Sequence, residues 1–140
     1  MGPYFLSYGL TLIFFVILDA IWLGSTSALL YRPVLGDMLL DKLRILPAIA
    51  FYLLYPAGLF IFAVLPAIKA GAFWPALIYG ALFGLVAYAT YDLTNFATLR
   101  NWTWQITFID LAWGAFASAM ASILAFAATR SLTSISGLMS

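Results

Sequence analysis

Four long stretches of apolar residues dominate the sequence and predict how the chain folds. They cover residues 4–24, 47–65, 74–98 and 104–129, and each has about the 20 residues that a helix needs to cross a bilayer. The stretches are continuously apolar, whereas the strands of a membrane barrel alternate apolar with polar residues. We therefore predict an all-α, polytopic membrane protein whose four transmembrane helices form one antiparallel bundle, with residues 1–140 as a single domain. The first stretch lacks the preceding positive charge of a signal peptide and exceeds its usual length, so we expect it to be retained.

Three aspartates interrupt these apolar stretches: Asp19, Asp92 and Asp110. The chain is 66% hydrophobic and only 8% charged, so the three acids stand out. A carboxyl group in the bilayer core costs at least a few kcal/mol, so it usually faces the bundle interior and marks a functional site. Counted from the helix ends at about 1.5 Å per residue, all three lie roughly 8–12 Å below the same membrane face. Their depth allows them to share one cavity.

The helical spacing around the acids supports convergence on one site. Asp92 follows Tyr88 by four residues and precedes Asn95 by three, which puts these side chains on one helix face. An Asp-x-x-Trp pattern occurs twice, and two tyrosines on the second helix point toward the same side of the membrane. The residues that we expect to bind a ligand are Asp19, Trp22, Tyr52, Tyr55, Tyr88, Tyr91, Asp92, Asn95, Asp110 and Trp113.

Several polar, small and aromatic residues also have a purely structural interpretation. In that interpretation the three acids accept hydrogen bonds from Trp, Tyr, Asn or Thr and lock the bundle. Gly80 and Gly84, with Gly114 on the last helix, are typical of faces on which membrane helices pack closely. Trp102 and Trp104 fall at predicted helix ends, where Trp usually lies at the membrane interface.

The residue types that the sequence lacks exclude much chemistry. There is no Cys and no His, which excludes disulfides, thiolate nucleophiles, imidazole bases and the usual zinc, haem and iron–sulfur ligand sets. No glycine-rich phosphate loop and no basic cluster for nucleic acid are present. We therefore assign no catalytic, cofactor or metal residues, and the identity of any cofactor is unknown.

The connections between the helices predict the orientation in the membrane. Four of the six Lys and Arg residues lie at residues 25–46 and 99–103, on one membrane side, and only Lys69 and Arg130 lie on the other. Cytoplasmic loops carry an excess of Lys and Arg, so we expect the first side to face the cytoplasm and both termini to lie outside. Residues 38–43 have the pattern of a short amphipathic helix at the interface, where its cations could contact lipid headgroups. A plain solvated loop is the favoured interpretation of this segment.

Four strings of residues carry a resemblance to a known family. They are Asp19-x-x-Trp-Leu-Gly, Tyr52-Leu-Leu-Tyr-Pro-x-Gly, Tyr88-Ala-Thr-Tyr-Asp-Leu-Thr-Asn and Asp110-x-x-Trp-Gly. With them the chain resembles, over nearly its whole length, an uncharacterised bacterial family of integral membrane proteins, the domain of unknown function family 2177. The resemblance implies a four-helix, multi-pass protein of the bacterial inner (cytoplasmic) membrane, and it implies no particular activity.

The acids favour one class of function and leave two others open. We expect a protein that binds or transports a small ligand, a proton or a lipid at an acidic site within the membrane. Two acids that lie close together repel each other, so one of them should keep its proton near neutral pH. The alternatives are a non-catalytic accessory subunit of a larger membrane complex and, less favoured, a lipid-modifying enzyme with paired carboxyls. The expected partners are the lipid bilayer and either a bound lipid or a membrane protein, with no nucleic acid.

Overall fold

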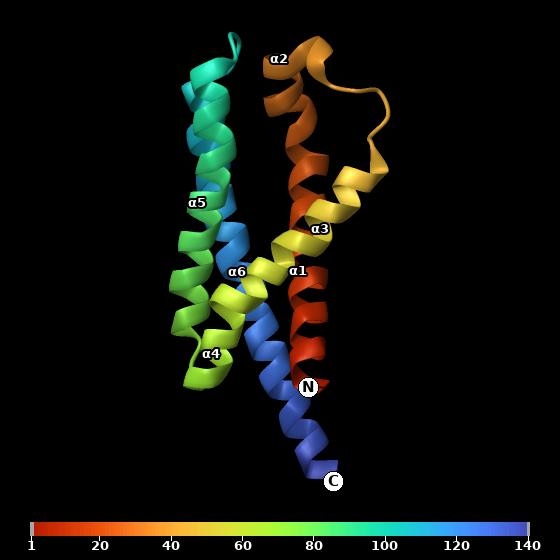
Figure 1. Ribbon diagram of the computed structural model, residues 1–140, viewed down its shortest axis with the longest axis vertical. Coiled ribbons are helices and arrows are strands. Elements are labelled where there is room, and N and C mark those ends of the chain that lie inside the picture. The colour runs from red at the N-terminus through yellow and green to blue at the C-terminus, as the bar shows by residue number, and fades with distance from the viewer. Residues whose placement is uncertain (1, 140) are drawn as a thin grey trace.

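The computed structural model describes residues 2–139, which form four long helical segments (Figure 1). The helical pieces, in chain order, are α1 (Gly2–Thr26), η1 (Ser27–Tyr31), α2 (Arg32–Leu35), η2 (Gly36–Met38), α3 (Ile45–Leu59), η3 (Phe60–Val64), α4 (Leu65–Ala70), α5 (Trp74–Thr98) and α6 (Trp104–Met139). Residues 2–139 contain no strand, and four of their helical segments are long and apolar enough to cross a membrane. The predicted all-α, four-helix membrane protein is therefore confirmed.

The helix boundaries agree best where the chain has clear ends. The predicted third helix, residues 74–98, has the bounds of α5. The last helix is longer than predicted, because α6 continues past residue 129 to Met139. The hydroxyls of Thr129 and Thr133 each donate a hydrogen bond to the carbonyl four residues earlier. Hydroxyl side chains that bond back in this way are compatible with a helix, so the polar end of the chain stays helical.

The amphipathic helix suggested for residues 38–43 is wrong. Helical structure ends at Met38, and residues 39–44 are irregular. Gly36 turns the chain with a φ of +51°, and Leu39 is extended, with a ψ of 133°. A stretch of six residues is too short to form a stable helix without tertiary packing, so the chain crosses back toward α3 as a loop.

Two helical segments contain one π-helical turn each, and both turns end two residues before a proline. The turn η1 ends at Tyr31, before Pro33, and the turn η3 ends at Val64, before Pro66. Proline has no N–H to bond the carbonyl four residues earlier. A π turn instead spans five residues, and its extra residue sets the following side chains back by about 100° around the helix.

The closest packing in the bundle joins α5 and α6. A Cβ atom built on Gly84 would lie 2.1 Å from the carbonyl oxygen of Gly114 and 2.5 Å from the hydroxyl oxygen of Ser118. A Cβ atom on Gly114 would lie 2.3 Å from Cγ of Tyr88. These distances leave no room for a side chain, so glycine is what lets the two helices approach. The predicted small-residue packing face is present.

The segment from α3 to α4 crosses the bundle diagonally (Figure 1). Its first part, α3, packs against α1, whereas its later parts, η3 and α4, are the ones that pack extensively on α5. Gly58 marks the crossing, because a Cβ atom there would lie 2.6 Å from Cζ of the Phe83 ring. From this point toward the η2 end of the molecule, α3 and α5 diverge.

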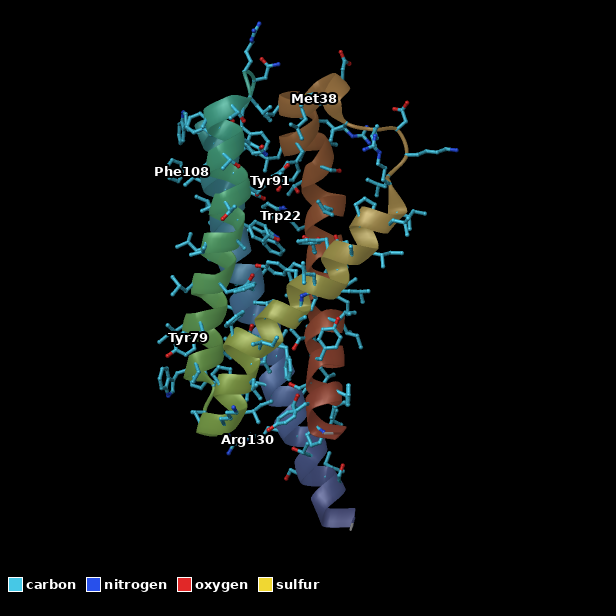
Figure 2. The ribbon with its side chains drawn as sticks, in the orientation of Figure 1. Trp22, Met38, Tyr79, Tyr91, Phe108 and Arg130 are labelled. Atoms are coloured by element: carbon cyan, nitrogen blue, oxygen red, sulfur yellow. The ribbon has the colours of Figure 1, made fainter. Side chains whose placement is uncertain are left out.

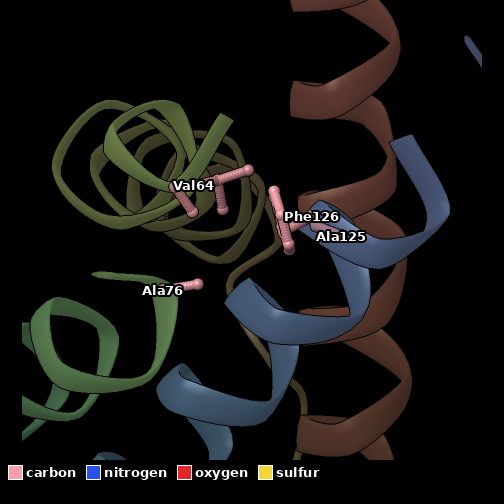
Figure 3. Close-up of a cluster of buried hydrophobic side chains, with 5 residues drawn as sticks. Val64, Ala76, Ala125 and Phe126 are labelled. Atoms are coloured by element: carbon pink, nitrogen blue, oxygen red, sulfur yellow. The ribbon is translucent and has the colours of Figure 1, made fainter. Parts of the chain in front are cut away.

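Buried side chains fill the end of the bundle away from the acids. Val64, Ala67, Ala76, Ala125 and Phe126 form one buried cluster there (Figure 3). The other face of each helix is apolar and exposed, as expected for helices that contact lipid.

The prediction that Trp102 lies at the interface as an anchor is wrong. Its side chain is only 5% exposed, and its Nε1 donates a 2.9 Å hydrogen bond to the hydroxyl of Thr107. Trp104, at 58% exposure, does lie on the outside. The two residues differ because the Trp102 indole has a polar partner inside the fold.

Candidate functional site

A cavity of about 980 Å³ lies at the end of the bundle that carries the loop after η2. Its walls come from α1, η1, α2, η2, the loop after η2, α3, α5 and α6. Six of the ten residues predicted to bind a ligand line this cavity: Asp19, Trp22, Tyr55, Tyr88, Tyr91 and Asp110. Figure 2 shows Trp22 and Tyr91 in the space between α1 and α5. Residues far apart in the chain thus converge on one place, at one end of the bundle.

Asp19 joins α1 to α3 at the floor of the cavity. Its side chain is 6% exposed, and its Oδ2 accepts a hydrogen bond from the hydroxyl of Tyr52. Tyr52 is not among the described residues that line the cavity. It therefore orients Asp19 from behind the cavity wall.

Asp110 is held by a chain of hydrogen bonds that begins on α1. The Nε1 of Trp22 donates a 3.0 Å hydrogen bond to the hydroxyl of Tyr31, and that hydroxyl donates to Oδ1 of Asp110. An indole N–H is only a donor, so the Tyr31 hydroxyl is the acceptor in the first bond. In the second bond Asp110 accepts at Oδ1.

Tyr31 is the main site residue that the sequence did not predict. In a regular α-helix it would lie about 120° away from Asp19, on a different face. The π turn η1 sets it back by about one residue, which brings its hydroxyl onto the Asp19 and Trp22 face of the segment. Pro33, two residues beyond the turn, was the available signal.

Asp92 lies behind the cavity wall, next to Asp110. Its side chain is wholly buried, and neither of its carboxyl oxygens has a hydrogen-bond partner among residues 2–139. The two carboxyls are close enough to interact electrostatically. Asn95, which the sequence placed in the same polar cluster, interacts with Tyr91 and is not among the described residues that line the cavity.

The two Asp-x-x-Trp turns pack against each other across α1 and α6. The rings of Trp22 and Trp113 are stacked, with centroids 4.5 Å apart and an interplanar angle of 5°. Trp113 lies beside Asp19, and its buried Nε1 interacts with that carboxyl group. The repeated pattern therefore has a structural basis, because each turn supplies one acid and one ring to the same place.

Comparison with known protein families identifies the chain. A family model described as "Predicted membrane protein (DUF2177)" matches residues 4–127. The chain belongs to this family. Comparison with curated proteins and with solved structures gave no match. The residues that line the cavity, from Asp19 to Asp110, all lie within the matched region, so the cavity belongs to the DUF2177 part of the chain.

The loop after η2 and α3 supply further residues of the lining. Leu39, Leu40 and Leu43 of the loop and Phe51 of α3 contribute apolar walls, and Asp41 adds a further acid. In this DUF2177 protein the loop is therefore part of the cavity rather than a plain solvated connection. The sequence did not predict these lining residues, because nothing in their local pattern indicates that the loop folds back over the site.

The arrangement has a polar floor and apolar walls. Carboxyl and phenol groups lie at the floor, and aromatic rings and leucine side chains surround them. Among the described residues, no group of three His, Cys, Asp or Glu side chains is placed to hold a metal ion. A cavity with this distribution suits a molecule that has one polar end and one apolar part.

Proposed function

We propose that this protein binds one amphipathic, lipid-like molecule taken from the bilayer of the bacterial inner membrane. The observation that carries the proposal is the cavity, whose acidic floor lies within the membrane-spanning part of the bundle and whose apolar walls are open to the side. Its volume, about 980 Å³, lies at the upper end of the usual range for small-molecule pockets.

Two exposed residues of the lining support an opening of the cavity between α3 and α5. Phe51 of α3 and Tyr91 of α5 both line the cavity, yet they are 41% and 50% exposed. The two helices diverge in this half of the molecule, whereas the later parts of the α3–α4 segment close against α5. The outer surface of a membrane bundle contacts lipid, so a lipid-like molecule reaches the floor through this opening without crossing water.

Native mass spectrometry tests the proposal on the full chain, purified in a mild detergent. Wild-type protein is expected to retain a bound amphipathic molecule of defined mass. Ala87→Trp adds bulk to the lining on α5 and should abolish the bound mass. Val86→Trp is the matched control, because Val86 is the neighbouring residue, is 59% exposed and faces outward.

Two outcomes would contradict the proposal. Wild-type protein without any bound small molecule, but with a co-purifying membrane protein, would favour the accessory-subunit alternative. Equal retention in the Ala87→Trp and Val86→Trp variants would place the bound molecule on the outer surface. Thermal unfolding of both variants checks that each is folded before the masses are compared.

A further inference from the structure

Acidic side chains outnumber basic ones among the described residues that line the cavity. We infer that the polar end of the ligand is positively charged, either a primary ammonium or a quaternary ammonium group. This inference rests on the proposed function and adds the chemistry of the head. Asp19, Asp41 and Asp110 line the cavity, and Arg32 is the one basic residue among the described residues of the lining.

The hydrogen bonds at the floor leave acceptors for a ligand. Tyr52 donates to Oδ2 of Asp19, and Tyr31 donates to Oδ1 of Asp110, so these bonds use one oxygen of each carboxyl. Tyrosine hydroxyls orient the two acids but do not neutralise them. A carboxylate offers about four lone-pair sites, so each acid keeps acceptor capacity for a charge-assisted hydrogen bond from an ammonium group.

The aromatic walls also favour a positively charged ligand head. Trp22, Tyr31, Tyr88 and Tyr91 line the cavity together with the acids. Trp113 stacks on one face of Trp22 and holds that ring in place. Aromatic faces attract cations, and several rings around a carboxylate are a recurring way to bind quaternary ammonium groups.

An anionic head fits the cavity poorly. A phosphate or sulfate at the floor would lie beside Asp19 and Asp110, with Asp92 buried directly behind them. Arg32, the one cation in the lining, is itself exposed. Its solvated charge does not offset the acids at the floor, because charge interactions weaken strongly in water.

Four amphiphiles with the same dodecyl chain test the inference in a neutral maltoside detergent. They are dodecylamine, dodecyltrimethylammonium, dodecyl glucoside and dodecyl phosphate, and their affinities are measured by tryptophan fluorescence and native mass spectrometry. The two cations are expected to bind at least about tenfold more tightly than the neutral glucoside, as one or two charge-assisted contacts would give. The phosphate should bind most weakly.

Two aspartate variants connect this preference to the cavity floor. Asp19→Asn should remove most of the preference for the cations over the glucoside. Asp37→Asn is the matched control, because Asp37 lies in η2 and is exposed, and the cavity lining does not include it among the described residues. It removes the same charge and should leave the preference intact.

The possible results separate this inference from the function on which it rests. Equal affinities of the cations and the glucoside for wild-type protein would overturn the cationic head while leaving lipid binding in place. No binding of any amphiphile would overturn both. If Asp19→Asn does not fold, the affinity ranking of the four head groups on wild-type protein tests the inference. Asp41→Asn in the loop then serves as the second variant, and a smaller loss of the preference for cations is expected.

Discussion

At the scale of single residues, Tyr31 connects the two halves of the site. It accepts a hydrogen bond from Trp22 and donates one to Asp110, so it joins the first helical segment to the last. Its hydroxyl is half-buried and has partners on both sides. Removing it would leave an indole N–H without an acceptor and a carboxyl without a donor.

We expect Tyr31→Phe to lower the free energy of unfolding by about 1–3 kcal/mol, because it leaves buried polar groups unpaired. Thermal unfolding in detergent measures the change. Tyr79→Phe is the control, since Tyr79 points away from the bundle and is 43% exposed (Figure 2). Equal effects of the two variants would show that the hydroxyl of Tyr31 contributes nothing to the fold.

Asp92 supports a second prediction at this scale. A wholly buried carboxylate without hydrogen-bond partners would be very costly, and Asp110 next to it adds repulsion. We therefore expect one carboxyl of this pair to hold a proton at neutral pH. Infrared spectroscopy of purified protein should show a protonated-carboxyl band.

The Asp92→Asn variant should abolish this band and stay folded, because asparagine keeps the shape of the side chain and removes the ionisation. Asp37→Asn, at an exposed acid, should leave the band unchanged. Absence of the band from mildly acidic to neutral pH would mean that both acids are ionised. An unfolded Asp92→Asn protein would mean that the carboxyl is mainly structural.

At the scale of helices, the contact between α5 and α6 depends on glycine. We expect Gly84→Leu to destabilise the protein by at least about 2 kcal/mol, because overpacking forces the two backbones apart. The carbonyl of Gly114 and the side chain of Ser118 occupy the space that a larger residue would need. Thermal unfolding measures the loss.

Gly9→Leu is the matched control for Gly84→Leu. Gly9 is also a helical glycine, but a Cβ atom built on it meets nothing within 4 Å. Leucine has a better helix propensity than glycine, so this variant should be as stable as the wild type or more stable. A similar loss in both variants would show that glycine at position 84 is not needed for packing.

The π turns show how a local change within one helix alters the residues that form the site. Each turn precedes a proline, and η1 changes the direction in which Tyr31 points. A sequence pattern based on 3.6 residues per turn places Tyr31 on the wrong face, because it assumes an unbroken register. The same pattern works for Asp19 and Trp22, which lie before the turn.

At the scale of the whole molecule, the two ends of the bundle differ in charge. The α2–η2 segment and the turn between α5 and α6 lie side by side, since one small pocket is lined by Leu35, Met38, Leu99 and Trp102. The chain termini lie at the other end (Figure 1). The excess of Lys and Arg at the first end predicts that this end faces the cytoplasm.

The absence of cysteine from the sequence makes this orientation simple to test. Asp37→Cys should be protected from a membrane-impermeant maleimide in intact cells and labelled after lysis. Ser134→Cys, near the end of α6, should be labelled in intact cells. The helix has 36 residues, so it is about 54 Å long and extends past a hydrocarbon core of about 30 Å. The reverse pattern would invert the orientation.

The features of this protein that the sequence predicts well are those that depend on local chemistry alone. The free energy of placing apolar side chains in lipid acts on each stretch by itself, so the four spans and the bounds of α5 can be read from composition. The rise per residue fixes depth, so the acids could be assigned to one end before any packing was known. Small residues at helical spacing similarly indicated the contact between Gly84 and Gly114.

Only the tertiary structure decided how the cavity is built. The π turn at Tyr31, the loop leucines over the site and the buried position of Trp102 depend on contacts with residues far away in the chain. The divergence of α3 from α5 is set at Gly58, where the helix meets Phe83 of another element. Burial of a polar group is decided by its partners rather than by its neighbours in sequence. The sequence therefore determined which segments are long and apolar enough to span a membrane and at which end of the bundle the acids lie. Tertiary packing decided which residues face each other across a cavity.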